Sequence, residues 1–179
     1  MLIKVLAGLA VLVIVLVIVV AMQPAQYGIS RTATIAAPPT AVFAEVNDFH
    51  RWVAWSPWER IDPAMKRDYQ GAPAGSGAVY TWTGNRDVGQ GRMTMTESRP
   101  NELIRIRLEF FKPMAAVSTA EFRFTPSGPN TLVTWSMNGE KNFMAKAMHL
   151  LLNMDAMIGD NFDKGLAQLK SMVESGSKS

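Results

Sequence analysis

The ionisable side chains that could take part in catalysis are few, and they are spread along the chain. The two histidines, His50 and His149, lack a partner at a spacing typical of a general base, which needs a positioned neighbour. His149 borders the apolar stripe of a predicted helix and faces either solvent or a cavity mouth. Asp155, Asp160 and Asp163 follow on that helix and indicate a solvated face, since carboxylates are rarely buried unpaired. We assign no catalytic residue and favour a protein that is not an enzyme, with enzymatic activity as an open alternative.

Metal and cofactor chemistry has equally little support in the sequence. The chain contains 0 cysteines and has no His-x-x-x-His pair, so it shows no thiolate or paired-histidine metal site. The glycine-containing segments 75–77 and 89–91 are typical of turns. We predict neither a metal nor a cofactor. The net charge of +3 comes from charges that alternate in sign without long runs, which indicates no nucleic-acid partner.

Apolar side chains indicate a binding surface instead. The chain has 12 methionines, whose flexible and polarizable side chains suit an adaptable apolar pocket. Aromatic residues would add rigid walls, and their indole N–H groups would supply a few polar contacts. The predicted ligand-binding residues are Tyr80, Trp82, Met93, Met95, Trp135, Met137, Met154 and Ile158. Ordinary filling of a core by methionine is the alternative interpretation.

The N-terminal segment predicts a membrane anchor. Val5 to Met22 contains no charged residue, and as a helix it covers roughly 27 Å, close to the thickness of a hydrocarbon core. A cleaved signal peptide is the alternative, although its apolar region is usually shorter. Lys4 favours a cytoplasmic N-terminus and hence a folded domain on the periplasmic or extracellular side. The predicted organisation is a transmembrane helix over 1–23, a linker over 24–29, one domain over 30–174 and a flexible tail over 175–179.

Hydrophobic periodicity predicts the order of elements in that domain. A strand over 30–36 precedes two short helices near 39–46 and 49–55. Alternating segments then predict strands at 79–83, 92–97, 103–111, 122–125 and 133–137, joined by Gly, Pro and Asn clusters. Apolar residues three and four apart predict one long helix over 143–173, with Gly159 and Gly165 as candidate bends. The pattern indicates an antiparallel sheet with one buried face, covered by this helix.

Several short motifs carry a resemblance to a known family. Ala36-Ala37-Pro38-Pro39 is followed by a segment with Trp52, Trp55 and Trp58, and Gly75-Ser76-Gly77 leads into a strand with Tyr80 and Trp82. With the closing hairpin of 122–125 and 131–137, this order resembles the START-like (SRPBCC) superfamily, the polyketide cyclase/dehydrase group. It is most similar to bacterial members with one N-terminal hydrophobic segment, and it covers roughly residues 30–173.

The resemblance implies an α+β helix-grip fold, in which a curved antiparallel sheet wraps round a long C-terminal helix and leaves an apolar cavity. It also implies a binding domain for a hydrophobic small molecule or lipid, held on the membrane by Val5–Met22. Two alternatives remain: a polyketide cyclase/dehydratase-like enzyme, and a protein-interaction module with a filled core. The three tryptophans at 52, 55 and 58 belong either to the core or, if exposed, to a membrane-contacting surface.

Overall fold

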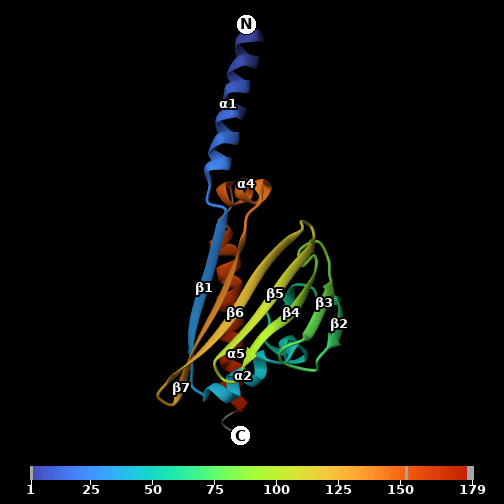
Figure 1. The fold of residues 1–179 in the computed structure, drawn as a ribbon, viewed down its shortest axis with the longest axis vertical. Helices are drawn as coiled ribbons and strands as arrows, with labels where there is room; N and C mark the ends of the chain where they lie inside the picture. The colour runs from blue at the N-terminus through green and yellow to red at the C-terminus, as the bar shows by residue number, and fades with distance from the viewer. Residues whose placement is uncertain (1, 152, 177–179) are drawn as a thin grey trace.

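The structure, a computed structural model, describes residues 2–151 and 153–176, without the side chains of Leu151 and Met154. An isolated helix stands on a domain made of one curved sheet and several helices (Figure 1). The helices are α1 (Leu2–Met22), α2 (Pro39–Val46), the 3-10 helix η1 (Phe49–Ala54), α3 (Trp58–Ile61), α4 (Phe143–Leu151) and α5 (Met154–Gly176). The strands are β1 (Gln26–Ile35), β2 (Lys66–Gly71), β3 (Ala78–Thr83), β4 (Gln90–Arg99), β5 (Leu103–Lys112), β6 (Ala116–Ser127) and β7 (Asn130–Glu140).

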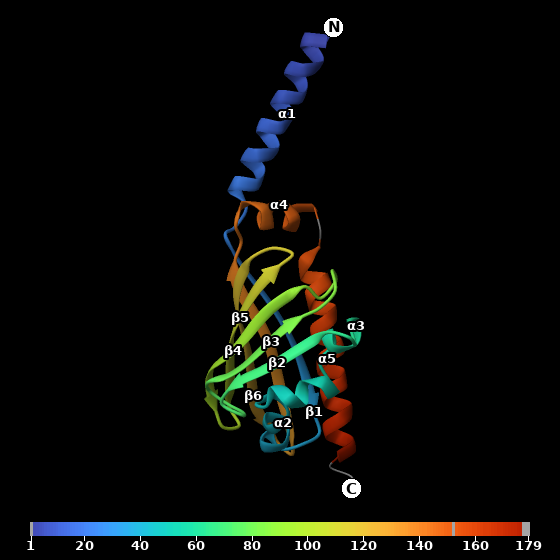
Figure 2. The ribbon, with the colours of Figure 1, turned by 90° about the vertical axis from the view of Figure 1, so that its right-hand side faces the viewer.

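The seven strands form one antiparallel sheet in the order β1-β7-β6-β5-β4-β3-β2. The α+β helix-grip fold class is thereby confirmed: the sheet curves, and α5 lies along its inner side (Figure 2). The alternation of side chains places one face of each strand in the core. In β7, Val133, Trp135 and Met137 are buried while the neighbouring Leu132 and Asn138 are exposed.

The C-terminal helix covers the sheet through the stripe seen in the sequence. Phe162, Leu166, Leu169 and Val173 of α5 are buried against the sheet and α2. A Cβ at Gly165 would stand 2.8 Å from Cζ3 of Trp135, so this glycine permits close approach of helix and sheet. The helix runs through both predicted bends without a break.

The expected single helix over 143–173 is divided in two. The break falls near Asn153, whose side-chain Oδ1 accepts a hydrogen bond from the backbone N–H of Ala156 at 3.1 Å. Asn142 caps α4 in the same way, accepting from the backbone N–H of Ala145 at 2.8 Å. Asparagine caps satisfy the free N–H groups of a helix start, so each helix has its own beginning and α4 turns away from α5 (Figure 2).

The connection between α1 and the sheet is also shorter than the predicted linker over 24–29. Gln26 already pairs with Glu140, so β1 begins four residues before the expected start at Ser30. The reason is the length of β7, which supplies hydrogen-bonding partners beyond the expected strand. Lys141, just after β7, donates its backbone N–H to the carbonyl of Ala25 at 2.6 Å.

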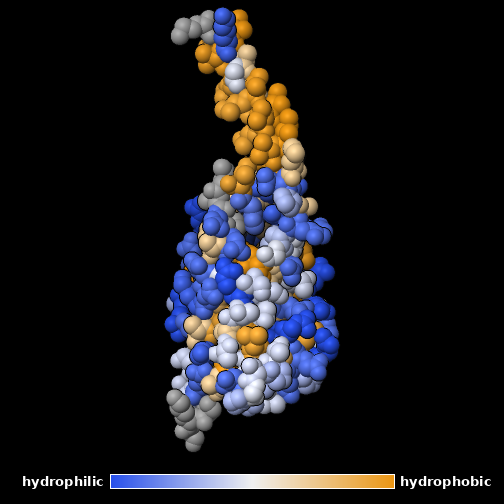
Figure 3. Space-filling model, turned by 90° about the vertical axis from the view of Figure 1, so that its left-hand side faces the viewer, coloured by the Kyte–Doolittle hydropathy of each residue, from blue (hydrophilic) through white to orange (hydrophobic). Residues whose placement is uncertain are grey.

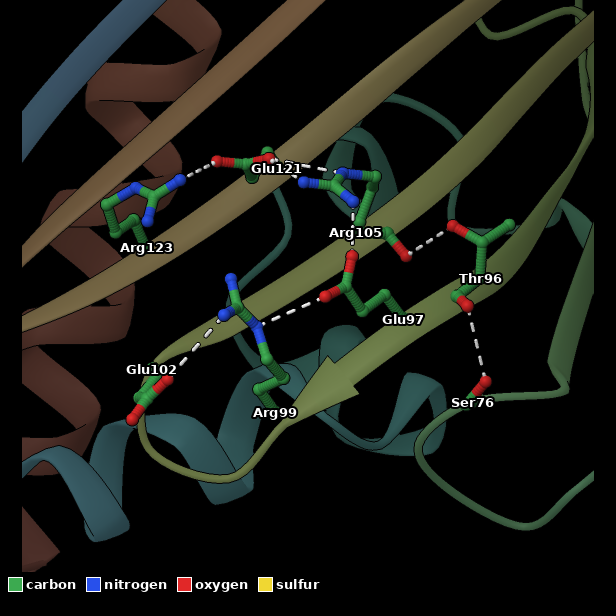
Figure 4. A network of polar contacts seen from close by, with 8 residues as sticks. All are labelled: Ser76, Thr96, Glu97, Arg99, Glu102, Arg105, Glu121 and Arg123. Carbon is green, nitrogen blue, oxygen red and sulfur yellow. Dashed lines mark hydrogen bonds and ion pairs between the residues drawn. The ribbon is translucent and has the colours of Figure 1, made fainter.

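The outer face of the sheet carries a network of charged side chains across β4, β5 and β6 (Figure 4). Arg105 of β5 contacts Glu97 of β4 and lies 2.9 Å from Glu121 of β6. Glu121 in turn accepts from Arg123 at 2.6 Å. Exposed ion pairs of this kind contribute at most about 1 kcal/mol each. The network therefore marks the solvent side, and any apolar cavity must lie on the opposite face.

Candidate ligand-binding site

A cavity of about 420 Å³ lies between the inner face of the sheet and helices α4 and α5. Its volume falls within the usual range of small-molecule sites, about 300–1,000 Å³. The walls are mainly apolar and come from most elements of the domain. They include Trp52, Trp58, Met65, Met93, Leu108, Phe110, Ala120, Met137, Met148, Ile158 and Phe162.

Strand directions show where this cavity opens. Its exposed lining residues include Lys112 at the end of β5, Ala116 at the start of β6 and Glu140 at the end of β7. In an antiparallel sheet these positions share one edge, and Phe110 pairs with Ala116 there. The start of β1 lies at the same edge, since Tyr27 pairs with Gly139. The cavity mouth is therefore on the side of the domain from which α1 emerges (Figure 1).

Six of the eight residues predicted from sequence line this cavity. They are Tyr80, Trp82, Met93, Trp135, Met137 and Ile158. Met95 does not line it: its side chain is fully buried in the core, and its carbonyl accepts from Gly77 N–H at 2.8 Å. The side chain of Met154 lies outside the described part of the structure. Their role in binding remains a prediction.

An aromatic cluster closes the inner end of the cavity. Trp135 is stacked between Phe162, with ring centroids 4.1 Å apart, and Phe122, at 4.7 Å. Trp52 and Trp55 meet this stack edge-on, and both are buried. The core interpretation of the tryptophan segment is thus correct for these two residues, while Trp58 is half-buried in the cavity wall. Packed rings of this kind make a rigid wall.

The buried indole N–H groups differ in whether they have a partner. Trp52 donates to the carbonyl of Val46 at 2.9 Å, and Trp82 donates to that of Val88 at 3.3 Å. Nε1 of Trp135 has no hydrogen-bond partner among the described residues, although the side chain is only 3% exposed. Buried polar groups are nearly always hydrogen-bonded, so this unpaired donor is an exception among the described residues.

One buried carboxylate also lines the cavity. Glu59 of α3 is 8% exposed; it accepts a hydrogen bond from the hydroxyl of Tyr80 at 2.9 Å and lies 2.6 Å from the guanidinium of Arg67. Burial, and then the negative charge of Glu59, raise the pKa of Tyr80 well above its usual range. Hydrogen bonding to Glu59 raises the pKa of Arg67. Tyr80 is therefore a neutral donor and Arg67 a fixed cation, so neither acts as a base.

Glu59→Gln is expected to lower the free energy of unfolding by about 2–3 kcal/mol, because it leaves the Arg67 charge without its buried partner. Glu45→Gln is the matched control, since Glu45 also lies 2.6 Å from an arginine, Arg51, whose side chain is 50% exposed. That control should change stability by less than about 1 kcal/mol. Denaturant unfolding followed by tryptophan fluorescence measures both, and equal losses would contradict a special role for burial.

The two histidines lie in different places. His149 of α4 lines the cavity mouth, with its ring 5.5 Å from that of Tyr27. Burial, and then the charge of Lys141, lower the pKa of His149, so the neutral ring is favoured there. His50 stacks on Tyr69 and bonds Asp48 at 2.8 Å, away from the cavity lining. Asp155 and Asp163 are exposed and face Arg31 at 3.5 and 3.2 Å.

Sequence reasoning missed the polar residues of the site. Glu59 stands in a short helix after Pro57, and one acidic residue among tryptophans is no signal of burial. Lys112, Glu140 and Lys141 at the mouth lie at strand ends, where charged residues are common on any sheet. Only the antiparallel pairing brings these positions together at one edge.

Comparison with known proteins places the chain in a family. Residues 27–174 match the sequence profile of the family described as polyketide cyclase / dehydrase and lipid transport. The match covers most of the chain, so the protein belongs to this family and is a START-like (SRPBCC) domain of the ligand-binding or cyclase-like type. A search of curated proteins finds no match to the sequence.

Solved structures share the fold at low sequence identity. Protein CV1439 from Chromobacterium violaceum has a TM-score of 0.60 at 15% identity, covering 82% of this chain and 96% of its own. The Aha1 dimer from Colwellia psychrerythraea has a TM-score of 0.60 at 15% identity, covering 83% and 96%. CalU16 from Micromonospora echinospora has a TM-score of 0.53 at 13% identity, covering 84% of each chain. At these identities the likeness concerns the fold alone.

Proposed function

We propose that this protein is a membrane-tethered domain that binds a hydrophobic small molecule or lipid in the cavity between sheet and helices. The observation that carries the proposal is a cavity of about 420 Å³ with mainly apolar walls; Trp135 in its wall has a buried Nε1 with no partner among the described residues. Apolar clefts with a few placed polar groups are the usual form of ligand sites. A protein-interaction module with a filled core would not contain a cavity of this volume.

The unpaired donor gives the ligand a chemical requirement. The Trp135 ring stacks on both Phe122 and Phe162, and its Cζ3 lies close to Gly165. Trp135 lines the cavity and its Nε1 has no acceptor among the described residues, which supports a hydrogen bond to a ligand atom seated against this ring. A carbonyl, ether or hydroxyl oxygen would accept this hydrogen bond. The proposed ligand therefore has an apolar body and an acceptor at its inner end.

Trp135→Phe is expected to lower ligand affinity about tenfold, the value of one hydrogen bond in a buried site. A phenyl ring retains the stack on Phe162 and removes only the N–H group and part of the indole. Trp82→Phe is the control, because the Trp82 indole already donates to Val88 inside the protein. Titration with the extracted ligand measures both variants, and equal losses of affinity would argue against a role for the Trp135 N–H.

The membrane part of the proposal rests on α1. Leu2–Met22 has a mean hydropathy of 3.4 over its most apolar window and is the one helix among the described residues long and apolar enough to cross a bilayer. Such a helix is compatible with an anchor or a signal sequence. Its length and the position of Lys4 support an uncleaved anchor with the domain on the periplasmic or extracellular side. Protease protection in sealed vesicles would test this orientation.

An enzymatic function, cyclase- or dehydratase-like, is the second candidate because Glu59 and Tyr80 line the cavity. Both oxygens of Glu59 are already engaged by Tyr80 and Arg67. This favours a role in fixing the inner wall over proton transfer. Catalysis would instead be supported if the ligand extracted from the wild-type protein were chemically altered and the ligand extracted from Tyr80→Phe were not.

The experiment that tests the proposed function is native mass spectrometry of the full chain released from detergent micelles, with organic extraction of bound molecules. Ala120→Phe, which fills the cavity, serves as a control with the same anchor and the same background of membrane lipid. A species bound stoichiometrically to wild type and absent from the variant would support the proposal. Identical spectra after exposure to membrane extract would refute it.

A further inference from the structure

Exposed apolar side chains gather at the end of the domain where α1 enters. Three belong to α4: Phe143 is 50% exposed, Met144 58% and Leu150 41%. Two more lie at or next to the turn between β5 and β6, where Phe111 is 50% exposed and Met114 36%. In Figure 1, α4 lies crosswise at the foot of α1, and the β5–β6 turn points the same way. We call these five residues the apolar rim.

Helix α4 has two apolar faces with different surroundings. Ala145, Met148 and His149 line the cavity mouth. Phe143 and Leu150 lie on the other side, since a rotation of about 100° per residue separates the two sets. The surface of the domain on the face seen in Figure 3 is mainly hydrophilic, while α1 above it is mostly hydrophobic. The outer face of α4 thus continues the apolar surface of α1.

The position of α4 relative to α1 is held by specific contacts. Lys146 of α4 donates from Nζ to the carbonyl of Ala21 at 3.1 Å, which satisfies a free C=O at the end of α1. Only Gln23, Pro24 and Ala25 separate α1 from β1, and the carbonyl of Ala25 accepts a hydrogen bond from the backbone N–H of Lys141. If α1 spans the bilayer, as the proposed function requires, its last residues mark the membrane surface. The apolar rim then stands at the level of the lipid headgroups.

We propose that the apolar rim docks on the bilayer that α1 enters, and that the ligand is an amphiphile of that leaflet, which passes directly into the cavity. An amphipathic helix at this level places its apolar side at the boundary of headgroups and acyl chains. The cavity mouth opens at the same edge, between α4 and the β5–β6 turn, so a lipid entering there keeps its apolar part out of water. The inference rests on the proposed function for the ligand and for the anchor.

Docking is tested on the full chain in nanodiscs of phosphatidylcholine and phosphatidylglycerol. The chain has 0 cysteines, so single variants Met144→Cys and Met114→Cys accept an environment-sensitive fluorophore at one known place. Thr119→Cys, exposed on the outer face of β6, is the control. Blue-shifted emission quenched by doxyl lipids at both rim positions, but not at the control, is expected. If the label at both rim positions gave the same emission as the label at Thr119→Cys, the docking proposal would be overturned.

Uptake is tested separately with parinaric acid, a fluorescent fatty acid, detected by energy transfer from the tryptophans of the domain. We expect Phe143→Ser/Met144→Ser to slow transfer from the nanodisc about tenfold, while leaving unchanged the affinity for parinaric acid added to the chain in micelles. Equal transfer rates in wild type and variant would overturn direct uptake. Absence of binding in micelles by both proteins would count against the proposed function, and the cysteine labelling would still decide on docking.

Discussion

Replacing Ala120 with Phe should reduce ligand affinity at least about a hundredfold while the domain stays folded. Ala120 lies on the inner face of β6, opposite Met137, and lines the cavity. A phenyl ring there displaces roughly four methylene-sized groups of a ligand, each contributing about 0.8 kcal/mol. Titration of the full chain with parinaric acid measures the loss.

The control for this substitution is its neighbour on the same strand. Thr119→Phe introduces the same ring on the exposed outer face of β6, where it meets solvent and not the cavity. Affinity should stay within about twofold of wild type, because surface substitutions usually have small effects. Equal loss of affinity in both variants would show that the ligand binds elsewhere or that the strand itself is disturbed.

The largest effect on stability is expected for Phe122→Ala, about 3–5 kcal/mol, enough to threaten folding. Phe122 is fully buried, stacks on Trp135 at 4.7 Å and meets Trp52 and Trp55 edge-on. Removing the ring leaves a cavity among large side chains that cannot collapse. Thermal and denaturant unfolding of the full chain in micelles would measure the change.

Phe111→Ala provides the comparison, since it removes the same ring from a side chain that is 50% exposed. Its effect on stability should be within about 0.5 kcal/mol. The pair separates the contribution of burial from that of residue type. A loss below about 1 kcal/mol for Phe122→Ala would mean that the aromatic cluster is loosely packed, and the rigid inner wall assigned to the cavity would be wrong.

These results would connect the architecture to binding. The sheet wraps round α5 but leaves the end near α1 partly open, where α4 turns away. The inner end is rigid, because Trp135 is fixed between two phenylalanines. The methionines Met93, Met137 and Met148 lie in the wall and adapt to varied shapes. A rigid end with one donor and adaptable sides suits amphiphiles of variable apolar length.

Local patterns in the sequence were sufficient for the elements and the fold class. Alternation in 103–111 predicted β5, because a strand exposes successive side chains to opposite faces. The stripe through Phe162, Leu166 and Leu169 predicted the covering helix, and an uncharged run of 18 residues predicted a helix like α1. These signals are periodic and short-range, so one chain contains them completely.

The site depended on long-range pairing that no local pattern contains. Met93 and Met95 share one face of β4 and look alike in sequence, yet only Met93 reaches the cavity while Met95 lies fully in the core. Trp82 and Trp135 both carry an indole N–H. The carbonyl of Val88 accepts a hydrogen bond from Trp82, whereas Trp135 has no acceptor among the described residues. The burial of Glu59 beside Tyr80 and Arg67 depends on how α3 packs on β2 and β3. The hydrophobic period and the composition of a segment set which face of the element is apolar. The register of the seven strands and the turn between α4 and α5 decide which side chains line the cavity.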